Sequence, residues 1–449
     1  MSKSQKMKRN VMTPSCAERS LITHYALRIT MILLLATLFF TSSAGAVDLN
    51  LQELIDDALS INPEIQAAEA EYSASKYRVP QAKSLPDPML MFGYQNEGTD
   101  SLTYGDMADS QFMYSASQMF PFPGKRGLKG EMSQKESESA LSSLQNRKLR
   151  TVARVKELYY DLLLAYKSLD LVSDRKVLFT RIEDAALARY SAGRGMQQEV
   201  IMAQTEKYML LEREAMLSQR IEATESMLNR ETGRPVDSPL GRPVEIASPA
   251  VTMPLKELIA IGTTGSPDVT GRGKMIEAAD ARLKMARKEY YPDFTFTGNY
   301  MRRGSDFMDM WSITASMNIP LYYKTKQRQA VNEANAMLEA SRKELESSRL
   351  MLASEIRDNY SMMQTAERLM ELYREGLIPK AYQDFDAAIS GYTTGQIEAI
   401  TTITRLKALI EFEALYWEQF ALREKAIARL EALTAHSATM NHETVGEKK

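Results

Sequence analysis

The sequence repeats itself once, and this repeat constrains the fold more than any other feature. Leu51–Ile55 returns as Leu255–Ile259, 204 positions later. Further matches follow in the same order, at shifts of 204, 206, 199 and 202: Asn62–Ile65 with Ser266–Val269, Pro86-Asp87 with Pro292-Asp293, Ser115–Ser117 with Thr314–Ser316, and Tyr190–Gly193 with Tyr392–Gly395. Matches that keep their order indicate a duplicated unit of about 200 residues.

A proline-rich segment separates the two copies. Residues 231–254 hold five prolines, which preclude a regular helix or a central strand. We therefore predict a first repeat over 47–230, a linker over 231–254 and a second repeat over 255–433. The polar residues 434–449 are predicted to form a disordered tail.

Each repeat contains two segments in which apolar and polar residues alternate. They cover 88–96 and 111–119 in the first repeat, and 293–301 and 311–319 in the second. A period of two predicts strands with one apolar and one polar face. The sequence therefore predicts one pair of strands in each repeat.

Each strand pair is followed by a stretch with helical periodicity, over 125–190 and 324–392. Apolar residues at spacings of three and four predict coiled-coil seams. These seams hold Val152, Val155, Tyr159, Leu162, Tyr166 and Leu169, and then Leu352, Ile356, Tyr360, Met363, Ala366 and Met370. A helix of about 66 residues is roughly 100 Å long, too long for one compact core to cover.

Shorter helices complete each repeat. We predict return helices over 196–230 and 395–433, and a helix before each strand pair, over 63–84 in the first repeat. Pro379 is predicted to kink the second long helix, because proline lacks the backbone N–H that a helix needs.

The N-terminus has the pattern of a secretory signal. Ile29–Phe40 is an uncharged apolar run, preceded by basic residues and followed by Ala44–Ala46. The run is too short to span a bilayer, and the small residues after it are typical of a cleavage site. We predict that residues 1–46 are a signal peptide cleaved after Ala46, which would remove the single cysteine, Cys16.

The composition argues against several classes of function. The 449 residues include 56 Lys and Arg against 58 Asp and Glu, with no basic block that would favour nucleic acid. The one cysteine and three histidines lie near the termini, and the sequence contains no nucleotide-binding, zinc-protease or serine-hydrolase motif. We predict no enzyme, no cofactor and no metal site. The 28 methionines leave two interpretations open, packing in irregular helix seams, which is favoured, and contact with a soft metal ion.

Four amphipathic strands are too few for a membrane barrel. The smallest such barrels need eight strands, and open strand edges are not tolerated in lipid. The chain would therefore pool its strands with copies of itself, and three copies would supply twelve. In that barrel lipid would meet Trp311, Ile313 and Ala315, while the lumen would meet Ser312, Thr314 and Ser316. The alternative is one face of a soluble sandwich, which the export signal and the lack of further core residues disfavour.

The sequence resembles the TolC-type outer-membrane efflux family over nearly all of the chain after residue 46. The resemblance rests on Leu54–Ile65 (LIDDALSINPEI), Leu85–Pro88, Phe120–Arg126 (FPFPGKR), Arg189–Gly193 and Gly391–Gly395. It implies a mainly α-helical fold with a membrane β-barrel, in which a trimer forms a 12-stranded β-barrel on an α-helical barrel. The FPGKR and PDP segments look most like the branch that serves heavy-metal exporters.

The resemblance also implies a location, partners and a function. The trimer would sit in the outer membrane, in contact with lipid, and extend into the periplasm. It would be the passive exit duct of a tripartite efflux system for small solutes such as metal ions or drugs, docked on a periplasmic adaptor and driven by an inner-membrane pump. Two alternatives stay open, an exit duct for secreted polypeptides and a non-channel periplasmic coiled-coil adaptor or structural protein. Two hairpins per chain favour the channel, because adaptors usually carry one.

The resemblance assigns the two helix-to-helix turns to the periplasmic entrance. The adaptor contact would involve Gly193, Arg194, Gln197, Gly395, Gln396 and Glu398, and the entrance-lining candidates are Glu199, Thr401 and Thr404. In the best-known members aspartates occupy the places of Thr401 and Thr404, so we expect no strong acidic ring at the second turn. Glycine at each turn allows the positive φ that a tight reversal needs.

Overall fold

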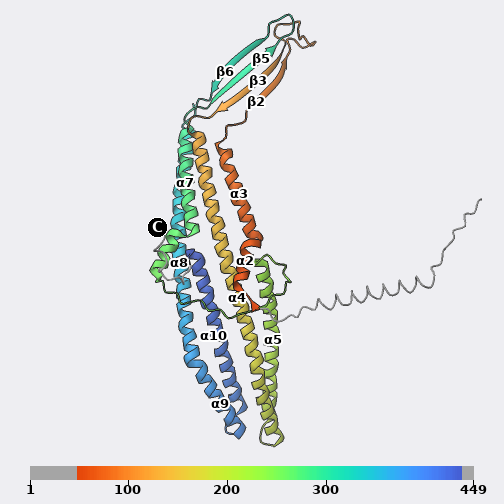
Figure 1. Cartoon of the computed structure of the whole chain (residues 1–449), viewed down its shortest axis with the longest axis vertical. Coiled ribbons are helices and arrows are strands. Elements are labelled where there is room, and N and C mark those ends of the chain that lie inside the picture. The colour runs from red at the N-terminus through yellow and green to blue at the C-terminus, as the bar shows by residue number, and fades with distance from the viewer. Residues whose placement is uncertain (1–47, 437–449) are drawn as a thin grey trace, which may run out of the picture. The chain divides into compact units, whose positions relative to one another are not determined.

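Two similar sets of elements follow each other along the chain (Figure 1). The computed structural model describes residues 48–436, so the predicted signal peptide and residues 437–449 of the predicted tail lie outside the described residues. The first set is β1 (Asp48–Leu49), α2 (Leu51–Ile61), α3 (Pro63–Lys83), β2 (Met89–Gln95), β3 (Gln111–Phe120), α4 (Lys125–Ser191) and α5 (Gln197–Glu231). After β4 (Arg242–Pro243), the second set is α6 (Leu255–Gly265), α7 (Pro267–Lys288), β5 (Phe294–Arg302), β6 (Met310–Met317), α8 (Gln327–Glu371), the π-helix η1 (Leu372–Leu377), α9 (Ile378–Thr394) and α10 (Ala399–Thr434).

Long helices and two antiparallel strand pairs confirm the predicted fold class at this level. Before each strand pair the chain forms two helices, because Asn62 interrupts the first repeat and Ser266 the second. The Asn62 side chain accepts a hydrogen bond from the backbone N–H of Glu64 at 2.7 Å and so caps α3, which begins at Pro63. Proline is suited to this first helical position, since its missing N–H would have no partner there.

The four long strands form one sheet in the order β2-β3-β5-β6. All neighbours are antiparallel, and the β3–β5 pairing joins the two repeats, with Tyr114 opposite Tyr300. The strands β2 and β6 are the two edges of the sheet (Figure 1). Each edge leaves one row of backbone N–H and C=O groups without a strand partner within the described residues, which is the arrangement that invites pairing with another chain.

The second long helix is interrupted where the sequence predicts a kink. The π turn of η1 ends at Leu377, and Pro379 lies in the first turn of α9. Proline cannot donate to the residue four before it and its ring crowds that carbonyl, so the wider π turn relieves the clash. In the first repeat α4 has no proline and runs unbroken for 67 residues, roughly 100 Å.

Apolar clusters are distributed along the helices. One cluster surrounds Val155, Tyr159 and Leu162, all fully buried, and a second in the other repeat surrounds Ile356 and Met363. These five side chains belong to the predicted seams, which are thereby confirmed as the packed faces of α4 and α8. Among residues 48–436, no helix combines the length and the apolar character needed to cross a membrane.

The linker is held against the helices by polar contacts. The Tyr159 hydroxyl donates to the carbonyl of Val244 at 2.7 Å and accepts from the Val244 N–H at 2.9 Å. Arg423 of α10 donates to the Ser248 carbonyl at 3.0 Å, and the Ser248 N–H donates to Glu424 at 3.1 Å. These contacts provide hydrogen-bond partners for backbone groups of the linker, which the prolines prevent from forming a regular helix.

Candidate functional site

The two turns between long and return helices have the same backbone geometry. Gly193 has φ +68° and Gly395 has φ +82°, which confirms the predicted left-handed positions. The N–H of Arg194 donates to the carbonyl of Arg189 at 2.9 Å, and the N–H of Gln396 donates to that of Gly391 at 2.8 Å. A hydrogen bond from an N–H to the carbonyl five residues earlier is typical of a helix end with glycine in the left-handed conformation. Both turns therefore have the same short, specific backbone conformation.

Arg189 of α4 connects the first turn to the second. Its guanidinium donates through Nη1 to the backbone carbonyl of Tyr392 at 2.6 Å, and lies 4.8 Å from the centroid of the Tyr392 ring. A Cβ at Gly395 would lie 3.4 Å from the same Nη1. The two turns therefore form one surface, joined by a cation over an aromatic ring.

Tyr392 also reaches the return helix of the first hairpin. Its hydroxyl donates to Oε2 of Glu199 at 3.2 Å, and both side chains are buried, with exposed fractions of 0% and 9%. Burial, and then the charge and hydrogen bond of Glu199, raise the pKa of Tyr392 to about 12. In this structure Glu199 contacts Tyr392 of α9, and its lining of the entrance stays a prediction.

The other predicted residues of the turns are accessible. Thr404 is exposed and Thr401 half-buried, both on α10, whereas Glu199 belongs to α5. The predicted docking residues are all exposed: Gly193, Arg194, Gln197, Gly395, Gln396 and Glu398. Sequence reasoning missed Tyr190, Met196 and Ile400, whose exposed fractions of 46%, 63% and 45% add apolar area to this surface. A sequence signal was available for two of them, because Tyr190 and Met196 each lie three residues from the turn glycine Gly193.

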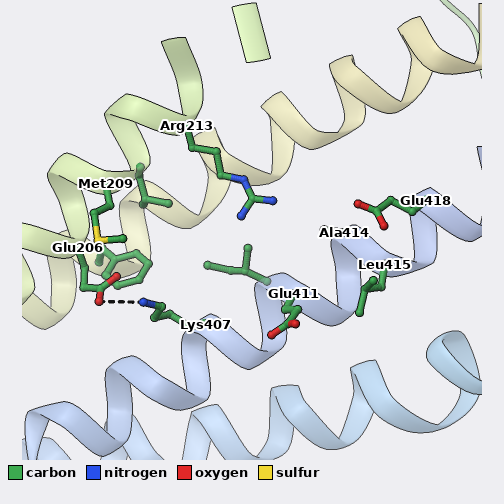
Figure 2. A pocket seen from close by; sticks show the side chains of 11 residues that line it. Glu206, Met209, Arg213, Lys407, Glu411, Ala414, Leu415 and Glu418 are labelled. Atoms are coloured by element: carbon green, nitrogen blue, oxygen red, sulfur yellow. Dashed lines mark hydrogen bonds and ion pairs between the residues drawn. The ribbon is translucent and has the colours of Figure 1, made fainter. Parts of the chain in front are cut away.

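A groove of about 420 Å³ lies between α5 and α10 (Figure 2), and Phe179 of α4 is one of its lining residues. Lys407 and Glu206 join the two helices across it at 3.0 Å. Arg175 of α4 pairs with Glu413 of α10 as well. The two hairpins are thus tied together by side chains both at the turns and along the helices.

The sheet has an apolar face and a polar face, as its alternation predicts. Trp311, Ile313 and Phe92 on the apolar face are 75%, 73% and 73% exposed. On the other face Ser115 donates to Asn299 at 2.7 Å, and Asn299 donates to Ser312 at 3.1 Å. These polar side chains are half-buried, whereas the large side chains of the apolar face are exposed. Contact of Trp311, Ile313 and Ala315 with lipid stays a prediction.

A buried lysine joins the sheet to the helices. Lys125, 6% exposed at the start of α4, lies 2.9 Å from Asp293 and donates to the carbonyl of Tyr291 at 3.1 Å. Asp293 also accepts from the N–H of Phe122 at 2.8 Å, and the rings of Phe122 and Tyr291 stack at 4.5 Å. This junction brings the FPGKR segment of the first repeat against Tyr291 and Asp293 of the second, so it joins the two repeats.

Comparison with known proteins gives the family. Residues 54–234 and 265–436 match the family described as outer membrane efflux protein. Among solved structures, the chain is similar to the outer-membrane channel OprN (16% identity, 87% of this chain and 91% of that one, TM-score 0.73) and to CusC (14%, 86% and 92%, TM-score 0.76). It is also similar to the CmeC outer membrane channel of Campylobacter jejuni (12%, 88% and 86%, TM-score 0.75). No curated protein sequence matches the chain. The family match covers most of both repeats, and the chain therefore belongs to the outer membrane efflux protein family, as a non-enzymatic efflux channel of the outer membrane.

Proposed function

We propose that three copies of the chain form a passive exit duct for small solutes, docked through the paired turns on a periplasmic adaptor and driven by an inner-membrane pump. The observation that carries the trimer is the four-stranded sheet with two free edges and an exposed apolar face. A sheet that spans lipid must close into a barrel, and three sheets of this kind supply twelve strands. The chain alone would leave both edges open.

The paired turns support the docking proposal. They present exposed polar groups around Gly193 and Gly395 together with the apolar side chains of Met196 and Ile400. A surface that combines exposed apolar and polar side chains is typical of protein–protein interfaces. Because Arg189 fixes one turn to the other, an adaptor would meet both as one surface.

Fractionation and mass test the trimer. The chain should be found in the outer-membrane fraction, and detergent-solubilised protein should have the mass of three copies. A stable monomer in the periplasmic fraction would instead support the alternative of a non-channel adaptor.

Substitution of the turn glycines tests docking. Arg at Gly193 or Gly395 should abolish export, because a β-carbon is strained at these φ values and a bulky cation changes the surface. Trimer formation should persist, since the sheet is roughly 100 Å away by helix length. Ser191→Arg is the matched control, because it adds the same cation at an exposed position of the same turn that is not glycine. Its export shows how much of the defect comes from the cation rather than from backbone strain. Normal export by both glycine variants would contradict the docking assignment. If the variants lost export of a secreted polypeptide but kept export of small solutes, the alternative of a polypeptide duct would be favoured.

One observation favours a soft metal ion among the candidate solutes. Met113, Met301 and Met310 lie opposite one another on three adjacent strands, on the polar face of the sheet. Thioethers are soft ligands suited to Cu(I). The neighbouring row of this face offers only hydroxyl and amide groups, those of Ser115, Asn299 and Ser312. Replacing the three methionines with leucine keeps their bulk, so a specific loss of copper or silver tolerance in cells would support metal export, and unchanged tolerance would oppose it.

A further inference from the structure

We propose that β6 of one copy pairs with β2 of the next in the register that β3 and β5 show inside the chain, and that Asp87 and Lys324 close this seam as Asp293 and Lys125 close the internal one. The inference rests on the proposed trimer and specifies its contacts. It follows from the internal repeat, because the β3–β5 seam already joins the end of one hairpin to the start of another.

The two hairpins correspond residue by residue. Tyr94 lies opposite Phe112 in the first, and Tyr300 lies opposite Trp311 in the second. A shift of 206 takes Tyr94 to Tyr300, and a shift of 199 takes Phe112 to Trp311, which are the shifts of the PD and Ser115–Ser117 matches. The sequence repeat is therefore also a repeat of strand register.

The same shifts convert the internal seam into the seam between copies. Tyr114 lies opposite Tyr300 in the chain, so Ile313 should lie opposite Tyr94 of the next copy. This register keeps the two faces of the sheet intact. It sets Ala315 against Phe92 on the apolar face, and Ser316 against Met91 on the polar face.

The register also closes a barrel of reasonable geometry. Opposite residues run from Phe92 to Tyr114, Tyr300 and Trp311, and then to Asn96 of the next copy. Each copy thus advances the register by four residues over four strands. One residue of rise, about 3.4 Å, for each strand spacing of about 4.8 Å corresponds to a tilt of roughly 35°. Membrane barrels have tilts of about 35–45°, so three copies can close in this register.

The junction beside the sheet supplies complementary charges for the same seam. The shift of 206 relates Asp293 to Asp87, and the shift of 199 that relates β3 to β6, continued past the strands, relates Lys125 to Lys324. Lys125 is the first residue of α4, whereas Lys324 lies in the turn three residues before α8 begins at Gln327. Both counterparts are exposed, and neither takes part in an ion pair among residues 48–436. An acid at one edge of the sheet and a base at the other are what a head-to-tail ring of copies requires.

An apolar contact is repeated as well. The stacked rings of Tyr291 and Phe122 correspond to Leu85 and Leu321, which are 38% and 74% exposed in the single chain. One contact is not repeated, because Lys83 stands where Glu289 approaches Lys125 at 3.3 Å. The ion pair between copies therefore has one carboxylate and should be weaker than the internal one.

Disulfide formation tests the register. In a Cys16→Ser background, the pair Ser316→Cys and Met91→Cys places thiols opposite each other between copies, whereas Ser316→Cys with Met89→Cys is displaced by two residues on the same face. Mass in detergent is measured first, so that the trimer is known before oxidation. We expect the first pair to give covalent trimers at least tenfold faster than the second. Faster bonding of the displaced pair, or no bonding of either in a proven trimer, would overturn the register and leave the proposed function standing. Absence of a trimer would overturn both.

A charge exchange tests the ion pair. Asp87→Lys and Lys324→Glu should each lower the temperature at which the trimer dissociates in detergent, and the two together should restore it. Lys326→Glu, two residues along, is the matched control and should not restore the Asp87→Lys variant. Restoration by Lys326→Glu instead of Lys324→Glu, or by neither, would overturn the assignment of Lys324.

Discussion

Single buried polar side chains hold the two hairpins together. Tyr392 is the clearest example, because its carbonyl accepts from Arg189, its ring lies under the same guanidinium, and its hydroxyl donates to Glu199. A buried acceptor that loses its donor costs about 1–3 kcal/mol. This surface therefore depends on a few contacts that can be removed one at a time.

Removing the Tyr392 hydroxyl should loosen the turns. Tyr392→Phe keeps the ring under Arg189 but leaves Glu199 buried without this donor. We therefore expect the free energy of unfolding to fall by about 1–3 kcal/mol, and the backbone amides of the turn to exchange hydrogen faster. Tyr190→Phe, at an exposed tyrosine of the first turn, is the control. Equal exchange in the two variants would show that the Tyr392–Glu199 contact contributes nothing.

The same tyrosine predicts a pH dependence. The pKa of Tyr392 is raised from its ordinary value of 10.0 to about 12, chiefly by burial and then by Glu199. A raised pKa means that the folded state holds the proton more tightly than the unfolded state. The stability that the protonated hydroxyl contributes is therefore complete below pH 10 and is lost as the pH rises toward 12. The difference in thermal stability between the wild type and Tyr392→Phe should narrow over this range. A difference that stays constant to pH 12 would contradict the assignment.

At the scale of elements, alternation within a strand separates two environments. In β6, Ile313 and Thr314 are neighbours in sequence but belong to opposite faces of the sheet. Ile313→Arg should destabilise the assembled barrel by about 2–4 kcal/mol if it meets lipid near the bilayer midplane, whereas Thr314→Arg should chiefly narrow the pore. Yield of folded trimer and single-channel conductance distinguish the two effects. Equal assembly defects would show that the faces have been assigned wrongly.

At the scale of the whole molecule, the sheet and the helices are joined at few points, of which Lys125 is the most buried charge. Its ammonium lies 2.9 Å from Asp293, whose side chain is 16% exposed. Removing one partner of a buried ion pair typically costs about 3–5 kcal/mol, so Lys125→Ala should lower the thermal midpoint markedly. Lys129→Ala, one turn further along α4 and exposed, should change it little. A similar midpoint for both variants would mean that the junction is stabilised by other contacts.

Much of the candidate site could be predicted because its signals are local. A left-handed residue at a helix end favours glycine whatever surrounds it, so Gly193 and Gly395 marked the turns. A strand's period of two and a helix seam depend on residues within a few positions of each other. The burial of Glu199 was not predictable in this way, because its partner Tyr392 is 193 residues away and on another hairpin.

The duplication, the four strands, the long helices and the two turns could all be predicted from the amino-acid sequence, since each is specified by a repeat, a periodicity, a proline or a glycine. The folded chain was needed to show that β3 pairs with β5, that Arg189 and Tyr392 join the turns, and that Lys125 pairs with Asp293 across the repeats. These contacts depend on how whole helices and hairpins pack against each other. The residues next to a side chain in sequence do not specify which distant side chain will pair with its charge or its hydrogen-bonding groups.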